Sequence, residues 1–348
     1  MGYRTAPRMI SGVSVVVLTY GYRAFVALCL NSLSRQVCRW PVEIIVVDNG
    51  STPEDWAHIE ADIERNGLDV KRIRLMTNIG FAAGMNTGLA EASHDVMIAL
   101  NSDVFAGEYA LDSLSARAMS VVAPSFFAMP VYDWIYPLTR ESRSRTLQAH
   151  AVVLTSHAGV LPVAWDQARE RALIGPPGPA VAFNRACWDR IVSEYGFFYD
   201  PAFFMYGEDV DLFLRASRAA IRLVRVPAEI DRDEVLWHAG GASGEAGTSR
   251  TAHREPLVMA NIARAWWRNA VQHSGWLELP VVLAIQMVAQ VLLIMACARR
   301  HGVRQSVEMF ASAVGQPARP HRRPRTWKPF LLPRISMVGR YLLRWQRP

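Results

Sequence analysis

Buried strands and helices alternate along the first hundred residues of the chain. Continuous apolar runs, which are typical of strands buried on both faces of a parallel sheet, occupy Ser14–Tyr20, Val42–Ser51 and Asp95–Asp103. An alternating run at Val70–Asn78 predicts one more strand between the second and third of them. Helices are expected between the strands, after the first of them (Phe25, Leu28, Cys29 and Leu33 at helical spacing) and over Pro53–Asn66 and Gly84–Ala92.

This β-α-β-α-β-α-β order predicts an α/β fold with a mostly parallel, Rossmann-like, doubly wound sheet and right-handed crossovers. In such sheets, ligands bind beyond the carboxyl ends of the strands. Polar side chains gather at those ends, which makes them candidates for binding: Thr19, Tyr20, Asp48, Asn49, Asn78, Asn101 and Asp103.

The chain becomes less regular after this alternation of strands and helices. Residues 115–179 are rich in Pro, Ser and Arg, which favours loops and short strands, and they show no pattern of chemistry. Gly175–Ile191 predicts a strand followed by a helix. Phe197–Ala220 is aromatic, then acidic, then helical, and Leu236–Gly241 is a short strand that ends in a histidine and two glycines.

The composition changes again at about residue 254, where a C-terminal helical extension is expected. Pro256–Gln272 predicts a helix, and Val281–Ala298 is a run of 18 residues without a charge. A membrane span needs about 20 such residues, so this run is borderline. Gln286 and Gln290 share one helix face, which makes the run mildly amphipathic. An in-plane membrane helix, or a helix packed on the catalytic domain or on a second subunit of a homo-oligomer, is favoured over a span.

Charge is distributed unevenly over the 348 residues, of which 51% are apolar and 20% charged, a composition that excludes wholesale disorder. Residues 299–348 hold eleven arginines and one lysine against one acid, a net charge of +11. Because the whole chain has a net charge of +7, the remaining residues carry −4. An acidic body argues against a specific nucleic-acid binder with a basic reading face. A basic tail beside an apolar segment favours an anionic membrane surface, and a disordered tail or non-specific RNA binding stays as the alternative.

Cysteines and the N-terminus favour a cytoplasmic protein. Four cysteines without paired spacing predict reduced thiols (Cys29, Cys38, Cys187 and Cys297). The first apolar run, Val13–Leu18, has six residues, whereas a secretory signal needs about 7–15. It is therefore interpreted as the first strand of the sheet.

Two short polar phrases end predicted strands. VVDNGS places Asp48 where a carboxylate can bind the hydroxyls or base of a nucleotide, although Asp-Asn-Gly is also an ordinary turn sequence. LNSD delivers Asn101 and Asp103, whose oxygens suit Mg²⁺ or Mn²⁺ when a nucleotide diphosphate supplies the remaining ligands. The alternative for LNSD is a strand-ending turn.

A third phrase, YGEDVDL, places three carboxylates within four residues at the start of a predicted helix. Like charges at this spacing repel one another, which favours a chemical role, although acids at a helix N-terminus also suit the helix dipole. The apolar residues FFMY precede them and make the surroundings partly dry. Such surroundings raise the pKa of a carboxyl towards values useful to a general base.

Together, the phrases VVVLTY, EIIVVDNGS, NIGFAAGMNTGL, IALNSD, FFMYGEDVDLFLR and LWH occur in an order that resembles the inverting, nucleotide-sugar-dependent glycosyltransferases of family 2, which have the GT-A fold. The closest likeness is to rhamnosyltransferase-like and galactofuranosyltransferase-like bacterial members. The resemblance covers about residues 12–240. One departure is visible, because Phe198 and Tyr199 stand where acidic residues often precede the FFMYGED phrase.

The resemblance implies a role for each matching residue. A base and ribose pocket is implied for Thr19, Tyr20, Asp48 and Asn49, and the neighbouring donor pocket for Asn78, Gly80, Phe81, Asn86 and Asn101. The implied metal ligands, for Mg²⁺ or Mn²⁺, are Asp103 and His238. The implied acidic catalytic pair is Glu208 and Asp209, with Asp209 as general base, while Asp211 supports the helix or the acceptor side.

A catalytic domain over residues 1–245 and a helical, basic, membrane-associating region over residues 246–348 follow from these assignments. The expected activity is inverting transfer of a sugar, with rhamnose from a dTDP donor as first choice by resemblance, to a hydroxyl of a glycan or polyprenyl-linked glycan. The expected place is the inner face of a bacterial cytoplasmic membrane, in cell-surface polysaccharide synthesis. Two alternatives stay open, a sugar nucleotidyltransferase and a non-catalytic membrane-associated scaffold of the same fold. The nucleotidyltransferase is disfavoured because TYGYRAF after the first strand lacks a glycine- and basic-rich phosphate loop.

Overall fold

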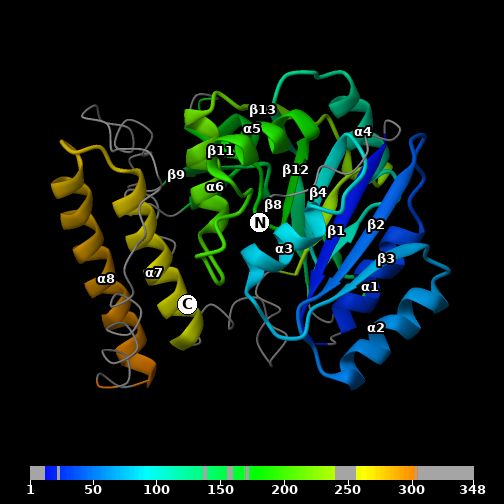
Figure 1. Cartoon of the computed structure of the whole chain (residues 1–348), viewed down its shortest axis with the longest axis horizontal. Coiled ribbons are helices and arrows are strands. Elements are labelled where there is room, and N and C mark those ends of the chain that lie inside the picture. Colours follow the sequence, from blue (N-terminus) through cyan, green and yellow to red (C-terminus); the bar gives the residue numbers. More distant parts are fainter. Residues whose placement is uncertain are drawn as a thin grey trace.

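A seven-stranded sheet forms the centre of the protein in a computed structural model (Figure 1). The structure describes residues 12–21, 24–135, 139–154, 160–167, 169, 172–239, 256–301 and 304. The sheet has the order β13 (Arg222–Arg225), β6 (Ser125–Ala128), β12 (Ala180–Asn184), β4 (Val96–Asn101), β1 (Val13–Thr19), β2 (Val42–Asp48) and β3 (Val70–Arg74).

Strands β4, β1, β2 and β3 run parallel, as the apolar runs predict, whereas β12 is antiparallel to both β4 and β6. The register places Thr19 beside Asp48 and Leu18 beside Asn101. The polar residues that follow these strands therefore meet at one edge of the sheet. The predicted mostly parallel α/β architecture is confirmed, and the antiparallel β12 makes the sheet a mixed one.

Helices cover both faces of the sheet, which explains why the central strands are apolar on both sides. One face carries a core cluster with α1 (Ala24–Ser34), α2 (Pro53–Arg65) and α4 (Ala110–Met119). The other face carries a cluster with α3 (Phe81–Leu89), α5 (Arg185–Tyr195) and α6 (Glu208–Arg218). Because α3 and α6 lie on the same face, the loops at their N-termini can meet.

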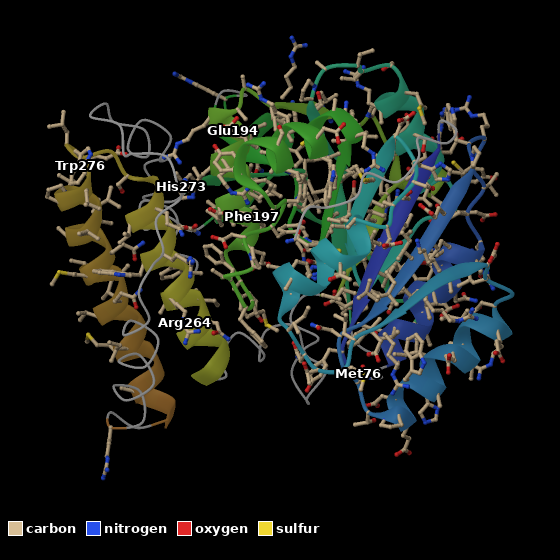
Figure 2. All side chains as sticks on the ribbon, in the orientation of Figure 1. Met76, Glu194, Phe197, Arg264, His273 and Trp276 are labelled. Atoms are coloured by element: carbon tan, nitrogen blue, oxygen red, sulfur yellow. The ribbon has the colours of Figure 1, made fainter. Side chains whose placement is uncertain are left out.

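Two element boundaries differ from the sequence prediction. Strand β3 ends at Arg74 instead of Asn78, and Met76 beyond it is 94% exposed (labelled in Figure 2). Helix α3 begins at Phe81 instead of Gly84, with Gly80 as its N-cap at φ +87°. A positive φ is accessible to glycine without steric cost, and the alternating pattern of residues 70–78 does not reveal where the strand stops pairing.

The middle of the chain forms two small sheets and short connecting elements. One sheet has the order β5 (Val104–Ala106), β14 (Leu236–His238), β7 (Val131–Trp134) and β8 (Arg143–Ala149). The other has the order β10 (Val160–Val163), β9 (Ala151–Leu154) and β11 (Leu173–Gly175). Two 3₁₀ turns complete the described elements, at Trp165–Gln167 and Ile230–Arg232.

A pair of C-terminal helices lies beside α6, with α8 (Leu279–His301) outermost and α7 (Pro256–His273) between it and the rest of the molecule (Figure 1). Within the described ranges, no helix is long and apolar enough to cross a membrane. The tail arginines beyond Arg304, together with Gly240 and Gly241, lie outside the described residues. The three cysteines whose side chains are described are unpaired, as predicted: Cys29, Cys38 and Cys187.

Candidate active site

The carboxyl ends of β1 and β2 hold two buried polar side chains side by side. Asp48 accepts a hydrogen bond from the backbone N–H of Ser51 at 3.0 Å through Oδ1. Its Oδ2 accepts no hydrogen bond within the described part of the chain, although Nε of Arg74 lies 3.5 Å away. The buried hydroxyl of Thr19 lacks a hydrogen-bond partner there too. Buried polar atoms normally find partners, so this edge offers a bound molecule both a hydroxyl and a carboxylate oxygen, with Tyr20 exposed at its rim.

Asn49 holds the loop between β3 and α3 in place. Its side-chain amide donates to Oδ1 of Asn78 at 3.0 Å and to the carbonyl of Gly80 at 3.3 Å, and its Oδ1 accepts from the N–H of Ile79 at 3.1 Å. Oδ1 of Asn78 also accepts from the N–H of Gly80 at 2.9 Å. Asn49 and Asn78 therefore shape this edge of the site through the loop they organise.

The start of α3 is joined to the segment that precedes the acidic phrase. The N–H of Phe81 donates to the carbonyl of Phe204 at 2.6 Å. A Cβ at Gly80 would lie 2.7 Å from that same carbonyl, so the close approach requires glycine. Asn86, which is buried, makes two hydrogen bonds to the backbone of Tyr199, at 2.7 and 2.9 Å. Asn86 thus holds the segment that contains Tyr199, which leads to α6, from within the core.

Phe198 and Tyr199 are core residues. Both are buried, and Phe198 stacks on Phe183 with ring centroids 4.2 Å apart and on Trp188 at 5.3 Å. The departure seen in the sequence at these two positions is therefore an aromatic anchor for the segment leading to α6. Charged side chains at such buried positions would need partners.

Asp103 and His238 are brought together by the pairing of β5 with β14. His238 lies opposite Val104, and its Nε2 is 3.4 Å from Oδ2 of Asp103. On its other side, Nδ1 of His238 lies 2.9 Å from Oε1 of Gln148, and Nε2 of Gln148 donates to Oδ1 of Asp133 at 3.2 Å. Oε1 of Gln148 can only accept, so this network assigns the histidine proton to Nδ1. In the neutral imidazole, Nε2 then presents a lone pair towards Asp103.

An unprotonated imidazole nitrogen facing a carboxylate is the donor set of a cation site. A ligating histidine normally donates its other N–H to a neighbouring acceptor, as His238 does to Gln148. Within the described residues, no group of three or more His, Cys, Asp or Glu side chains could hold a metal by itself. The arrangement therefore fits an ion that completes its coordination with phosphate oxygens and water, as Mg²⁺ commonly does.

Glu208 and Asp209 occupy the first turn of α6, directly after two residues in the left-handed region. Tyr206 has φ +69° and Gly207 φ +80°. A non-glycine residue at such a φ is strained, and such strain clusters at functional sites. Asp209 is partly exposed, and its Oδ2 would lie 2.7 Å from a Cβ placed on Gly178. Because the neighbouring carbonyl of Pro179 accepts from the N–H of Asn101 at 2.9 Å, the acidic pair and the end of β4 border the same segment.

Burial raises the pKa values of both carboxyls. Desolvation, followed by the nearby charges of Asp209 and Asp211, raises the pKa of Glu208 to about 8. Desolvation also raises the pKa of Asp209 above its usual range. Two interacting carboxyls lose their protons in separate steps. Glu208, which is the more deeply buried of the two, therefore keeps its proton to higher pH than Asp209.

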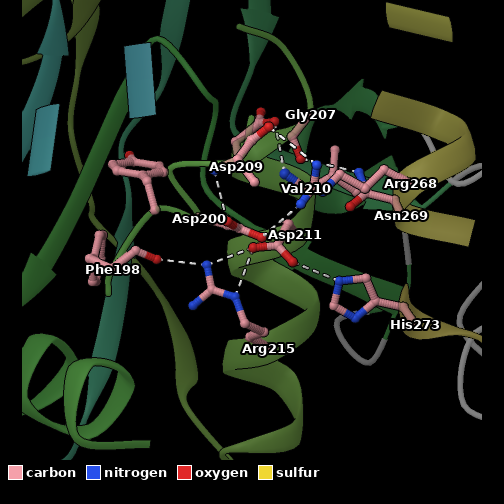
Figure 3. Close-up of polar contacts among 12 residues, drawn as sticks. Phe198, Asp200, Gly207, Asp209, Val210, Asp211, Arg215, Arg268, Asn269 and His273 are labelled. Atoms are coloured by element: carbon pink, nitrogen blue, oxygen red, sulfur yellow. Dashed lines mark hydrogen bonds and ion pairs between the residues drawn. The ribbon is translucent and has the colours of Figure 1, made fainter. Parts of the chain in front are cut away.

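The third carboxylate, Asp211, is fully buried and paired (Figure 3). Its Oδ2 accepts from Nε of Arg215 at 2.8 Å, and its Oδ1 lies 2.9 Å from Nε2 of His273 on α7. Arg215 also donates to the carbonyl of Phe198 at 2.7 Å. Nδ1 of His273 lies 2.8 Å from a guanidinium nitrogen of Arg218. Asp211 thus supports the helix, which is one of the two roles expected for it.

Helix α7 contacts the N-terminus of α6 at a second place. A Cβ on Gly207 would lie 2.4 Å from Cβ of Ala265, and the amide of Asn269 donates to the carbonyl of Gly207 at 3.1 Å (Figure 3). Arg268 donates to the carbonyl of Ala202 at 3.2 Å and lies 3.7 Å from Asp200. A small pocket separates residues 202–206 from α7. The loop before the acidic pair is therefore shaped by α7.

The predicted site residues form two neighbouring groups. Thr19, Asp48, Asn49, Asn78 and Gly80 gather at the ends of β1 to β3. The second group lies around the end of β4, and it consists of Asn101, Asp103, His238, Glu208 and Asp209. The chain from Tyr199 to Phe204, held by Asn86 and Phe81, connects the two groups.

Sequence reasoning missed four side chains of this region. Gln148 and Asp133 lie in the segment read as free of chemistry, and His273 and Asn269 lie in the C-terminal extension. Each one reaches the site from another element through tertiary pairing. None belongs to a motif, so the sequence carries no signal for them.

The structure has a parallel sheet with a polar carboxyl edge, an Asp–His pair at its end and an acidic helix start, which are the features on which the resemblance to GT-A glycosyltransferases rests. Residues 14–140 match the model of the family described as "Glycosyl transferase family 2". This match places residues 14–140 in glycosyltransferase family 2. The family prediction is confirmed, and the match favours sugar transfer over the nucleotidyltransferase and scaffold alternatives.

Among curated proteins, an N-acetylglucosaminyl-diphospho-decaprenol L-rhamnosyltransferase of Mycobacterium tuberculosis is 26% identical over 277 residues, 73% of this chain and 86% of that protein. An N-acetylglucosaminyltransferase of Azorhizobium caulinodans is 24% identical and covers 63% of this chain and 54% of its own length. Residues 1–349 of S. aureus TarS, solved with UDP-GlcNAc, superpose with a TM-score of 0.51 at 16% identity, covering 87% of this chain and 90% of that one. The chain spans 56% of a longer S. aureus TarS structure, with 88% of this chain covered, 14% identity and a TM-score of 0.46. A mannosyltransferase of Pyrobaculum calidifontis, solved with GDP-Man and Mn²⁺, has 17% identity and a TM-score of 0.47, with 89% and 79% covered.

Proposed function

We propose that the enzyme inverts the anomeric carbon as it transfers a sugar to a hydroxyl of a lipid-linked glycan, with Asp209 as general base. The observation that carries the proposal is that the two carboxyls of the acidic pair, Glu208 and Asp209, have different surroundings. Glu208 is buried and has its pKa raised to about 8, whereas Asp209 keeps some exposure and faces Gly178 beside the end of β4. A base must be reachable by the acceptor hydroxyl, and Asp209 is the member of the pair that keeps exposure.

In this proposal, Asp209 takes the proton of the acceptor hydroxyl as that oxygen attacks the sugar carbon. The bond from that carbon to the departing diphosphate breaks on the opposite face, which inverts the configuration. Positioned general bases contribute about 10²–10⁴-fold to a rate. Glu208, protonated near neutral pH, neighbours Asp209 without adding a second charge to the pocket.

Asp103 and His238 would hold Mg²⁺ or Mn²⁺ together with the donor diphosphate. The fit rests on the Nε2 of His238, which faces the Asp103 carboxylate at 3.4 Å and has its tautomer fixed by Gln148. The bound ion would supply charge neutralisation for the leaving diphosphate. Gln148 and Asp133 orient the imidazole from behind.

Asp48 and Thr19 would receive the nucleotide. Their unmatched buried oxygens, Oδ2 of Asp48 and Oγ1 of Thr19, can bond to the base and the ribose hydroxyls. Exposed Tyr20 would close over the base, and Asn49, Asn78, Gly80 and Phe81 would set the shape of the pocket around the donor. Asn101, whose side-chain oxygen also lacks a described partner, would lie beside the diphosphate.

Rhamnose from a dTDP donor is the first donor to test, because one relative is named as an L-rhamnosyltransferase that acts on a decaprenol-linked sugar. The acceptor would by the same likeness be a polyprenyl-linked glycan of bacterial cell-surface polysaccharide synthesis. A lipid-linked acceptor favours a cytoplasmic enzyme held at the inner face of the membrane. The catalytic unit would cover residues 1–245, with residues 246–348 as the membrane-associating region.

A donor screen tests the proposal. Full-length protein is incubated with a lipid-linked acceptor and a panel of nucleotide sugars, and nucleoside diphosphate release is measured with Mn²⁺ or with EDTA. Transfer with an inverted anomeric centre is expected for one donor. The Asp209→Asn variant should abolish it, while Asp69→Asn, which alters an exposed aspartate between α2 and β3, should not. Retained configuration in the product would contradict the proposal.

A further inference from the structure

Helix α8 has its polar side chains inside and its apolar side chains outside. Gln286 and Gln290 are buried and donate hydrogen bonds to α7 carbonyls, those of Trp266 at 3.1 Å and Ala263 at 2.9 Å. The sequence places both glutamines on one helix face, as expected, but this face contacts α7. A helix on the surface of a globular protein normally shows the reverse arrangement.

The opposite side of α8 forms a continuous apolar stripe, here called the outer face. Met287 and Val288 are more than 60% exposed at its centre. Its members recur at the three- and four-residue spacing of one helix side: Val281, Ala284, Met287, Val288, Val291, Leu292 and Met295. No charged residue occurs between Leu279 and Ala298. Exposed apolar patches of this kind mark sites of interaction with proteins or membranes.

We propose that the outer face of α8 inserts into the interfacial layer of an anionic lipid bilayer, with the helix lying in the membrane plane. Charge complementarity identifies the occupant. The last turn of α8 carries Arg299 and Arg300, Arg304 follows, and residues 299–348 together carry +11, which suits anionic headgroups. Exposed Trp276 lies at the other end of the helix (Figure 2), and tryptophan is enriched at the membrane interface.

A second copy of the chain fits the outer face less well. A parallel pairing of two outer faces would bring together the basic ends of two α8 helices, and like charges repel. A bilayer supplies both an apolar layer for the stripe and negative charge for the arginines. Gln286 and Gln290 make the face towards α7 polar, and no described helix is long and apolar enough to cross a membrane, which favours an in-plane helix over a span.

This docking has a consequence that rests on the proposed function. Helix α7 lies between α8 and the N-terminus of α6 (Figure 1), and packed helices lie about 8–10 Å apart. The acidic pair would then be held close to the membrane from which a lipid-linked acceptor comes. The docking itself does not depend on the sugar donor or on Asp209.

Flotation with vesicles tests the docking without measuring sugar transfer. Full-length protein is mixed with vesicles of equal parts phosphatidylcholine and phosphatidylglycerol, at low salt and at about 1 M NaCl, where the Debye length is about 3 Å. Wild-type protein should float at low salt and should still bind, more weakly, at high salt. A double variant, Val288→Asp with Leu292→Asp, should lose at least about tenfold of the high-salt binding, because carboxylates disfavour insertion.

The matched control is Val122→Asp, since Val122 is 90% exposed between α4 and β6 and lies outside the outer face. It should float like the wild type. A milder pair, Val288→Ser with Leu292→Ser, guards against misfolding and should weaken binding in the same direction. Unchanged flotation of both pairs would overturn the proposal. A dimer that dissociates in the double variant during sedimentation, with no vesicle binding by the wild type, would assign the face to a second copy instead.

Discussion

Replacing His273 by alanine should destabilise the junction of α6 and α7. The imidazole is fully buried between two charged groups, with Nε2 at 2.9 Å from Oδ1 of Asp211 and Nδ1 at 2.8 Å from Arg218. Alanine removes both contacts and leaves a space in the core. The backbone carbonyl of His273, which accepts a second bond from Arg218 at 2.8 Å, stays in place.

The expected loss in the free energy of unfolding depends on which contacts Asp211 and Arg218 keep when the imidazole is removed. A buried polar group that loses its partner costs about 1–3 kcal/mol, and more if it is charged. Breaking a buried ion pair outright costs about 3–5 kcal/mol, but Asp211 retains Arg215 at 2.8 Å. The free energy of unfolding should therefore fall by about 2–4 kcal/mol. His273→Gln should cost less, because its amide can still donate to Asp211.

Urea unfolding followed by tryptophan fluorescence measures this difference. His58→Ala serves as control, because it makes the same truncation on the exposed side of α2, and it should change stability by no more than about 0.5 kcal/mol. A loss below about 1 kcal/mol in His273→Ala, or a loss equal to that of the control, would refute the reasoning.

Three further outcomes are expected. Asp209→Asn should lower transfer by at least about 10²-fold with donor binding intact, and a variant that keeps about a tenth of the rate would contradict the base assignment. Asp103→Ala and His238→Ala should each weaken Mn²⁺ activation and donor affinity together, whereas full activity of the wild type in EDTA would contradict the metal site. The pKa of Glu208 is raised from 4.5 to about 8 in the folded protein, so the folded state binds this proton more tightly than the unfolded state. Stability should fall as pH rises through this interval, and Glu208→Gln should flatten the decline in melting temperature between pH 5 and 9. An unchanged slope in this variant would show that Glu208 does not carry the shift.

The parallel half of the sheet was predictable because buried strands leave a local signal. Three of the four strands are runs of apolar residues that end in polar ones, β3 alternates, and Asp48 and Asn101 close their strands as the sequence indicates. The antiparallel direction of β12 was not predictable. Direction depends on how the chain returns to the sheet, and residues 180–184 carry the same apolar pattern either way.

The site was predictable in its motifs but not in the contacts that hold them. Gln148 and His273 reach the site across long sequence separations, so neither periodicity nor spacing marks them. For α8 the sequence located Gln286 and Gln290 on one face, but the tertiary contact with α7 decides that this face is the buried one. A periodic pattern identifies which residues share a face, and only the neighbouring element determines which way that face points.

The first turn of α6 shows how one fold can separate three close carboxyls by their surroundings. Asp211 is paired in the core, where Arg215 and His273 contact its two oxygens. Glu208, which is buried without such a cation among its described contacts, has its pKa raised to about 8. Asp209 alone keeps exposure towards the edge of the sheet. The paired carboxylate secures the helix, the buried Glu208 holds its proton to higher pH, and Asp209, the proposed base, is the one of the three carboxyls that stays accessible.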